Sequence, residues 1–370
     1  MDRLVRLRLT NQKLVQSDLR DPAEIVARLG AVQSQDFPAA KWALALRLRS
    51  GQAQRPNGLT GDAIERAFDA GTILRTHILR PTWHFVTPAD IGWMLALTAP
   101  RVHQFSTHAH RQFELDSRTL SRARTIIARA LSDGSQLTRA ELAAALRRGG
   151  ITASGPRLGL LTIDIEINKI MCSGALRGRQ HTYARFDSRV PESRPRTREG
   201  SLAELTKRFF TGHGPATLRD FSWWSGLTLR DVREGLDLAK SELTLERVDD
   251  LEYWVGSDPA TDRLNPLSRR VRGSDPHPVA HLLPNYDEYL IAYKDRGLVG
   301  ASDLSAQEAY THQIVIDGQF VGTWKPVATK DGVRLDMKLR RALNSTEERA
   351  LQRAAADYGL FVGKAISTNL

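Results

Sequence analysis

The sequence predicts an α+β, mainly helical protein that consists of three tandem winged helix-turn-helix domains. The main observation is a pattern that occurs three times, in which helices joined by a turn precede a strand-rich stretch. The length of 370 residues is enough for two or three domains. The composition, with 41% hydrophobic and 26% charged residues, is typical of globular chains and excludes a protein that is disordered throughout.

The first occurrence begins with helices that have clear start signals. Asp21 is a suitable N-cap for a helix that ends at Gly30, and Asp36 is a suitable N-cap for the next helix. A third helix follows Thr60. Residues 72–86 then alternate and are rich in β-branched and aromatic types, which favours strands.

The second and third occurrences repeat this order. Thr138 and Glu141 have the spacing of a capping box at the start of a helix, and residues 172–187 resemble a β-hairpin. Residues 215–243 predict helix, turn and helix, and residues 243–256 predict strand, turn and strand. The recurrence carries the prediction, because a single occurrence arises easily by chance.

The rest of the chain suggests where domains begin and end. Residues 188–201 are rich in Pro, Ser and Arg and predict a linker or exposed loop. Asp317–Gly318 predicts a hairpin turn between two apolar runs, and residues 344–363 predict a closing helix. The predicted domains are winged helix 1 (1–118), winged helix 2 with the linker (119–198), and winged helix 3 with the C-terminal hairpin and closing helix (199–370).

Charge and cysteine content narrow the functional classes. The chain has 53 Lys and Arg against 42 Asp and Glu, a net charge of +11, which indicates either a solubility feature or a polyanionic partner. Cys172 is the single cysteine, so a disulfide framework and a cysteine-based metal cluster are excluded. No secretory signal and no apolar run of about 18 residues is present, so we expect a cytoplasmic protein.

The motifs of the common cofactor sites are missing. The sequence has no P-loop, no dinucleotide fingerprint and no metal-binding helix motif, so we expect no cofactor and no metal. His103, His108 and His110 are close in sequence, but His108 and His110 cannot share a helix face. We expect a solvated helix surface there.

Gln33 and Gln35 lie in the stretch QSQD between Gly30 and Pro38, two residues that argue against a helix. In an extended segment, alternate side chains point the same way, so the two amides would converge on one small polar ligand such as a water. The alternative, which spacing alone favours, is that both glutamines hold the turn to its neighbours. Asp36 is expected to be structural, as an N-cap.

The stretch LRPTWHFV places Arg80, Trp83 and His84 on or beside a strand. Alternation puts Trp83 and His84 on opposite faces. We expect Arg80 to meet a phosphate and Trp83 to support the core. For His84, a satisfied polar role and a contact to DNA are both open, and we include it among the candidate DNA contacts.

The stretch LLPNYDEYLIAYKDR follows an apolar, strand-like run. We expect supporting roles for Asn285, Tyr286 and Asp287. Asp287 and Arg296 are expected in a buried network of salt bridges and hydrogen bonds at a corner between domains.

Arginine clusters lie near predicted wings and hairpins, where winged-helix proteins contact the DNA backbone. Taken singly, each cluster is also consistent with a solvated face. Trp324 and Lys325 form an aromatic–basic pair after the predicted hairpin turn. Two interpretations are equally open, a pair that enters a DNA groove and a hairpin packing residue with its solvated neighbour. The candidate DNA contacts in these parts are Arg177, Arg179, Arg269, Arg270, Trp324 and Lys325.

The ordered set of QSQD, LRPTWHFV, GPATLRDFSWWSGL and LLPNYDEYLIAYKDR resembles the tandem winged-helix DNA glycosylases of the AlkZ and YcaQ type, over most of the chain. The resemblance implies a concave, basic DNA-binding surface and release of N7-alkylguanine by a bacterial enzyme. Gln33 and Gln35 match the Gln-x-Gln of the AlkZ branch, which unhooks crosslinks made by natural products such as azinomycin B. The YcaQ branch carries Gln-x-Asp, and Asp36 is out of step with that carboxylate.

From the resemblance we expect a monofunctional DNA N-glycosylase in which Gln35, assisted by Gln33, positions the hydrolytic water. Its expected partner is double-stranded DNA with alkylated or crosslinked guanine, bound by a monomer at the bacterial nucleoid. One alternative is a non-enzymatic winged-helix DNA-binding protein or transcription regulator. Another is a protein that sequesters the alkylating drug in a pocket lined by Trp83, Trp223 and Trp224.

Overall fold

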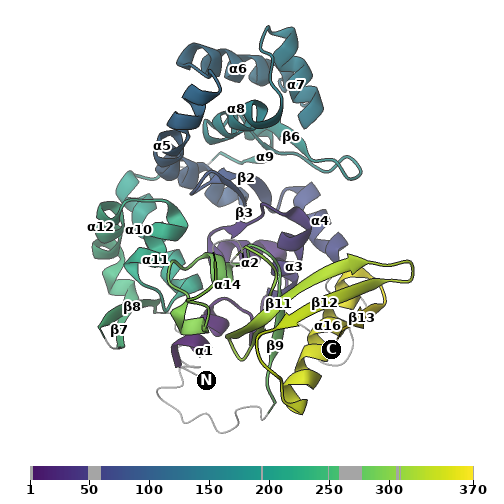
Figure 1. Ribbon diagram of the computed structural model, residues 1–370. Helices are drawn as coiled ribbons and strands as arrows, with labels where there is room; N and C mark the ends of the chain where they lie inside the picture. The colour runs from purple at the N-terminus through teal and green to yellow at the C-terminus, as the bar shows by residue number, and fades with distance from the viewer. Residues whose placement is uncertain are drawn as a thin grey trace.

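The computed structural model describes residues 3–48, 60–192, 195–248, 250–257, 277–305, 308 and 310–369. About half of these residues lie in helices, and the sheets are mainly antiparallel, so the predicted α+β class is confirmed. Figure 1 shows an upper part, a left-hand part and a lower right-hand part arranged around the N-terminal segments. No helix in the described ranges is long and apolar enough to cross a bilayer.

The first part of the chain forms helices around a small sheet with strand order β1-β3-β2. Asp21 caps α2 in a capping box, and Asp36 caps α3, as the sequence predicts. A long helix, α5, then leads to the next part of the chain. The elements are α2 (Pro22–Leu29), β1 (Val32–Gln33), α3 (Phe37–Arg47), α4 (Gly61–Ala70), β2 (Leu74–Ile78), β3 (Thr82–Val86) and α5 (Pro88–Gln112).

The second part, uppermost in Figure 1, has a hydrophobic cluster drawn from residues 113–183 alone. Thr138 and Glu141 form the predicted capping box at the start of α7. The small sheet has the order β4-β6-β5. The elements are α6 (Ser117–Ala130), β4 (Leu137–Thr138), α7 (Arg139–Arg148), α8 (Gly155–Ile167), β5 (Met171–Ser173), β6 (Thr182–Arg185) and α9 (Phe186–Arg189).

The third part pairs helices with a two-stranded sheet, and an N-terminal helix packs beside it. The buried Arg8 of α1 donates from Nε to the Pro215 carbonyl oxygen at 2.8 Å. The elements are α1 (Arg3–Asn11), α10 (Arg198–His213), α11 (Leu218–Ser225), α12 (Leu229–Ala239), η1 (Lys240–Glu242), β7 (Leu243–Val248) and β8 (Leu251–Gly256).

The C-terminal part contains a sheet of the order β13-β12-β11-β10-β9, which is larger than the single hairpin expected. The predicted turn at Asp317–Gly318 joins β10 and β11, and the closing helix is α16. The elements are β9 (Ala280–Leu283), α14 (Glu288–Ile291), η2 (Gly297–Val299), β10 (Gln313–Ile316), β11 (Gln319–Ala328), β12 (Val333–Leu339), α16 (Ser345–Val362) and β13 (Ile366–Thr368).

The beginning and the end of the chain share a core. One hydrophobic cluster combines Val26 and Phe85 with Leu282 and Trp324, so the C-terminal sheet packs directly on the first helices. This packing brings α14, in the centre of Figure 1, close to β1. The assignment of three winged helices, with boundaries at 118 and 198, stays a prediction.

Candidate active site

The Gln-x-Gln segment is an extended edge of the first sheet. β1 pairs antiparallel with β3, with Gln33 opposite His84, and the Ser34 amide donates to the Trp83 carbonyl oxygen at 2.7 Å. Asp36 ends the segment, because its carboxylate accepts from the Ala39 amide at 3.1 Å as the N-cap of α3. The segment between the two helices is therefore short and fixed at both ends.

Arg75 and Glu288 hold the backbone of this segment from two sides. The Arg75 guanidinium donates from Nε to the Ser34 carbonyl oxygen at 3.0 Å and from Nη2 to the Gln35 carbonyl oxygen at 3.4 Å. The Glu288 carboxylate accepts from the backbone N–H of Gln33 at 2.7 Å. Burial lowers the pKa of Arg75 to about 10, so the guanidinium stays charged at neutral pH.

Each glutamine side chain has a different environment. Gln33 is buried, with 5% of its surface exposed, and its Oε1 accepts from Nη2 of Arg80 at 3.1 Å. Gln35 is exposed, and its Oε1 accepts from the Trp83 amide at 3.3 Å. Since a carbonyl oxygen has two lone pairs, each amide oxygen retains one for a further donor.

Gln35 lies on a cavity of about 830 Å³ between the first and second parts of the chain. We call it the Gln35 cavity. Trp83 lines it with Arg75 stacked on its ring, the guanidinium carbon 4.3 Å from the ring centroid. Burial lowers the pKa of His181, another lining residue, to about 4. The lining residues are Gln35, Asp36, Phe37, Pro38, Arg75, Trp83, Thr138, Arg139, Ala140, Ala143, Ala153, Ser154, Gly155, Leu158, Gln180, His181 and Tyr183.

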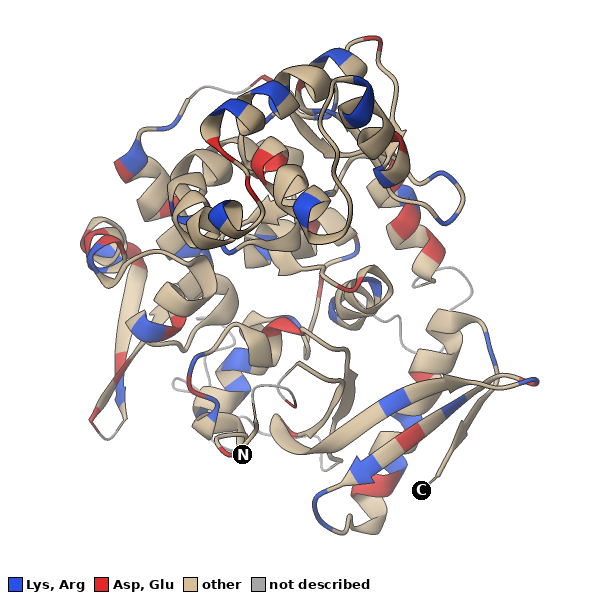
Figure 2. Cartoon of the chain, turned by 45° about the horizontal axis from the view of Figure 1, so that its top comes forward, with Lys and Arg blue, Asp and Glu red and all other residues tan. Residues whose placement is uncertain are grey.

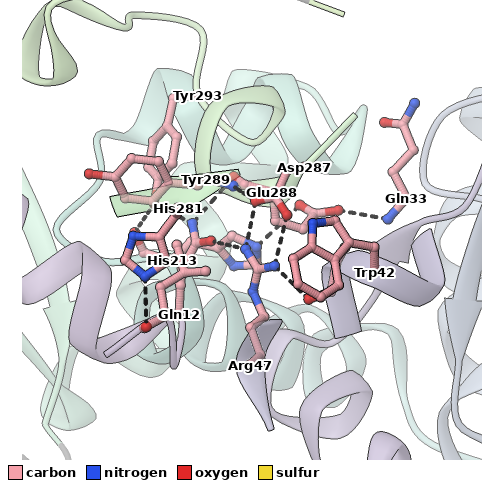
Figure 3. Close-up of polar contacts among 12 residues, drawn as sticks. Gln12, Gln33, Trp42, Arg47, His213, His281, Asp287, Glu288, Tyr289 and Tyr293 are labelled. Atoms are coloured by element: carbon pink, nitrogen blue, oxygen red, sulfur yellow. Dashed lines mark hydrogen bonds and ion pairs between the residues drawn. The ribbon is translucent and has the colours of Figure 1, made fainter. Parts of the chain in front are cut away.

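Glu288 belongs to a buried network behind Gln33 (Figure 3). Its Oε2 accepts from Nε1 of Trp224 at 3.0 Å and lies 3.3 Å from Nε2 of His213. Burial raises the pKa of the Glu288 carboxyl, but the hydrogen bond with His213 and nearby imidazoles lower it by more, so the pKa lies below its ordinary value. In Figure 3 the Gln33 side chain points away from this network, while its backbone nitrogen faces Glu288.

Asp287 lies in a buried network, as predicted, and its ion-pair partner there is Arg47. Nη1 and Nη2 of Arg47 donate to the two carboxylate oxygens at 2.8 and 2.7 Å, and both side chains have no exposed surface. Gln12 accepts a further bond from Arg47 at 2.9 Å. Arg296 instead donates to the Leu290 carbonyl oxygen at 3.1 Å, so its predicted place in this network is wrong.

Asn285 connects the start of α14 to the capped end of the Gln-x-Gln segment. Nδ2 of Asn285 donates to Oδ2 of Asp36 at 3.1 Å. Tyr286 has a φ of 60°, in the left-handed region, and its ring centroid lies 5.7 Å from that of Tyr310. The start of α14 is thus attached to both ends of the segment, at Gln33 and at Asp36.

Comparison with known proteins gives the family. The model of the family described as DNA glycosylase AlkZ-like matches residues 26–361. The chain belongs to the AlkZ-like DNA glycosylase family. No curated protein sequence matches it. The solved structure of the DNA glycosylase AlkZ from Streptomyces sahachiroi superposes with a TM-score of 0.77, covering 99% of this chain and 98% of that chain at 20% identity, and therefore has the same fold.

In this AlkZ-like protein, His84 and Trp324 are not at the surface, which corrects their predicted role as DNA contacts. His84 has no exposed surface, and its Nδ1 donates to the Thr82 carbonyl oxygen at 2.9 Å. Trp324 is 3% exposed, and its Nε1 donates to the Leu283 carbonyl oxygen at 2.8 Å. Strand alternation was the available signal, but alternation alone does not show which face of a strand the rest of the chain covers.

The other candidate DNA contacts fall into three groups. Arg80 is half-buried and bonded to Gln33. Arg177, Arg179 and Lys325 are exposed, although Arg177 is paired with Glu141 at 2.8 Å. Arg269 and Arg270 lie outside the described residues. Figure 2 shows Lys and Arg on the helices of the second part and on the long C-terminal hairpin.

The three tryptophans proposed for a drug pocket do not come together. Trp83 lines the Gln35 cavity, Trp223 lines a different cavity, and Trp224 is fully buried. Cys172 is a small buried core residue, and burial raises the pKa of its thiol to about 12. Among the described residues, no group of three His, Cys, Asp or Glu side chains is placed to hold a metal ion.

Sequence reasoning missed Arg75 and gave Glu288 no role, although these residues position the Gln-x-Gln backbone. Arg75 lies on β2, where alternation suggests a strand position but no partner. Glu288 contacts Gln33 across 255 residues of sequence, and no local pattern encodes such a contact.

Proposed function

We propose that the chain is a monofunctional DNA glycosylase that hydrolyses the N-glycosidic bond of N7-alkylguanine, including guanine joined in an interstrand crosslink. The observation that carries this proposal is the fixed Gln-x-Gln segment, with Gln35 on an open cavity and Gln33 behind it. Family membership supports DNA as the substrate. We further propose that the protein acts as a monomer at the bacterial nucleoid, in repair or in self-resistance to a natural product.

Release of an N7-alkylated guanine does not need a strong general acid. An N7-alkylated guanine carries a positive charge, so it departs as a neutral base while the sugar becomes oxocarbenium-like. The protein must orient one water and stabilise the developing positive charge. The free lone pairs on Oε1 of Gln33 and Gln35 supply negative dipole ends for both tasks.

The ionisable groups near the two glutamines fit a mechanism that uses neither a general acid nor a general base. His181 is neutral at pH 7, because its pKa is about 4, so it does not supply a proton to a leaving base. The carboxylate oxygens of Asp36 accept from the Ala39 amide and from Asn285, which fits a cap better than a general base. Neutral bases, which need a proton to leave, are therefore expected to be poor substrates.

The Gln35 cavity suits a lesion that is attached to the opposite strand. A crosslinked base cannot rotate fully into a closed pocket as in ordinary base flipping. The cavity, of about 830 Å³, lies between two parts of the chain and offers both apolar side chains and Trp83 for a bulky adduct. This geometry favours large alkyl groups over small ones as a match for the site.

The direct test is incubation of the protein with a duplex that carries one N7-methylguanine and with a duplex crosslinked through N7 of guanine. We expect abasic sites in the first and separated, abasic strands in the second, seen on gels after alkali treatment. A duplex with hypoxanthine, a neutral base, is the control and should stay intact. Binding to all three duplexes without base release would instead favour a non-enzymatic DNA-binding protein.

A further inference from the structure

A second cavity, of about 820 Å³, lies at the turn between β2 and β3, which contributes Arg80 and Pro81 to its lining, and we call it the Trp223 cavity. It is bounded by α5, by α11 and by the start of α12. Arg80 lines it and also bonds Gln33, so the cavity adjoins the candidate active site. The lining residues are Arg80, Pro81, Arg101, Phe105, Arg219, Ser222, Trp223, Gly226, Leu227, Leu229 and Lys294.

The charge of the Trp223 cavity fits an anion. Of the described residues that line it, Arg80, Arg101, Arg219 and Lys294 are cationic, and none carries a carboxylate. Arg219 and Lys294 are exposed, so their head groups are available to a ligand in solution. Cations that face a common space without a carboxylate repel one another, and a bound phosphate relieves that repulsion.

The aromatic residues of the cavity fit a base. Trp223 is half-buried and held by a hydrogen bond from its Nε1 to the Ile291 carbonyl oxygen at 3.0 Å. Phe105 is 49% exposed, which is unusual for a phenylalanine. The Arg80 guanidinium carbon lies 5.3 Å from the centroid of the Trp223 ring, and that of Arg101 lies 4.8 Å from the centroid of the Phe105 ring. Rings combined with cations bind unstacked nucleotides.

Arg80 provides a further, independent sign of a ligand. Its Nε is buried without a hydrogen-bond partner in the described part of the chain, while its Nη2 already bonds Gln33. A buried donor without a partner is costly, and an anion in the cavity is a natural acceptor. The same guanidinium would then contact the ligand and the candidate catalytic glutamine together.

We propose that the Trp223 cavity binds a nucleotide displaced from the duplex beside the lesion, with its base on Trp223 and Phe105 and its phosphate on Arg219 and Lys294. This proposal rests on the proposed function, because displacement of a neighbouring nucleotide is required only if the protein opens the duplex around a lesion. The Trp223 cavity would then bind a nucleotide next to the lesion, and the Gln35 cavity would bind the lesion itself.

The test measures binding of undamaged DNA, so it does not depend on base release. One duplex is fully paired and the other has a single unpaired thymine; affinities are measured by fluorescence anisotropy at several salt concentrations. Phe105→Ala and Trp223→Ala should each weaken binding of the bulged duplex by roughly tenfold and leave the paired duplex nearly unchanged. Leu360→Ala, which shortens a 57% exposed side chain on α16, is the control and should change neither.

A double variant tests the binding of the phosphate. Arg219→Ala with Lys294→Ala should reduce the slope of log affinity against log salt for the bulged duplex by about 0.9 for each phosphate that the protein no longer neutralises. Arg349→Ala with Lys364→Ala removes the same charge from exposed positions elsewhere and should leave the slope nearly unchanged. Equal weakening for paired and bulged DNA, or no weakening at all, would overturn the proposal. If the wild-type protein releases no base but shows the expected binding pattern, the proposed function fails, and the cavity is a site for an unpaired nucleotide that is not linked to a lesion.

Discussion

At the scale of single residues, the proposed chemistry depends on how two uncharged side chains are held in place. Gln33 and Gln35 each accept one hydrogen bond through Oε1, and their backbone is fixed by Arg75 and Glu288. A catalyst that orients a water gains from such rigidity, because small errors in position lower the rate strongly. We therefore propose that Glu288 is a positioning residue, which is buried and bonds the Gln33 backbone.

The change Glu288→Gln tests this positioning role. The new glutamine side chain keeps one acceptor oxygen, but its NH2 group replaces the other oxygen of the carboxylate. Either the backbone N–H of Gln33 or Nε1 of Trp224 is then left without its acceptor. We expect base release under single-turnover conditions to fall by roughly 10- to 100-fold. DNA affinity should be unchanged, and a urea titration at the same pH confirms that the variant is folded. An unchanged rate would show that Glu288 does not position Gln33 for the reaction.

His84 gives a second prediction at this scale, on stability. Burial lowers its pKa from 6.5 to about 4, so the folded protein binds the proton less tightly than the unfolded chain. Between these two values the unfolded state is more protonated, and the free energy of unfolding therefore decreases as the pH falls. The full contribution is up to about 3 kcal/mol, from about 1.4 kcal/mol for each pKa unit.

The measurement is urea unfolding at a series of pH values from 7 to 4. His84→Gln should lose less stability over this range than the wild-type protein, whatever its stability at pH 7. His108→Gln changes an exposed histidine and should follow the wild-type curve. A wild-type curve and a His84→Gln curve of equal slope would contradict the buried, neutral state of His84.

At the scale of elements, α14 joins parts of the chain that are far apart in sequence. Asp287 at its N-cap pairs with Arg47 of α3, and Glu288 bonds Gln33 of β1. The sequence predicted the helices and the extended Gln-x-Gln segment, because caps and alternation are local signals. It placed Asp287 in a buried network with Arg296 and did not find Arg47, because Arg47 lies 240 residues away and no local pattern points to it.

Removal of one member of this ion pair should be severe. Arg47→Met leaves the Asp287 carboxylate buried without its partner, and we expect the free energy of unfolding to fall by about 3–5 kcal/mol. Arg177→Met removes an exposed partner of Glu141 and should cost less than about 1 kcal/mol. Denaturant unfolding measures both. If the double variant Arg47→Met with Asp287→Asn is more stable than Arg47→Met alone, the unpaired charge is the cause of the loss. If Arg47→Met loses no more stability than Arg177→Met, the buried ion pair does not have the expected effect.

At the scale of the whole molecule, the net charge of +11 is consistent with a DNA substrate. Composition alone allowed two explanations of this charge, solubility and a polyanionic partner, and family membership favours DNA as that partner. The α+β class, the helix caps and the hairpin turn at Asp317–Gly318 were predictable, since each depends on neighbouring residues. The five-stranded C-terminal sheet and the burial of Trp324 were not, because both depend on how α16 and α3 pack on that sheet.

We propose above all that Gln33 and Gln35 orient the water that replaces the damaged base. The most direct measurement is the single-turnover rate of abasic-site formation on N7-methylguanine DNA for Gln33→Ala, Gln35→Ala and Gln180→Ala. Gln180 is an exposed glutamine that lines the Gln35 cavity, so it controls for the removal of an amide there. We predict that the first two variants are slower by roughly 100-fold with unchanged DNA affinity, and that Gln180→Ala matches the wild-type protein. Full rates in both Gln33→Ala and Gln35→Ala would contradict the claim.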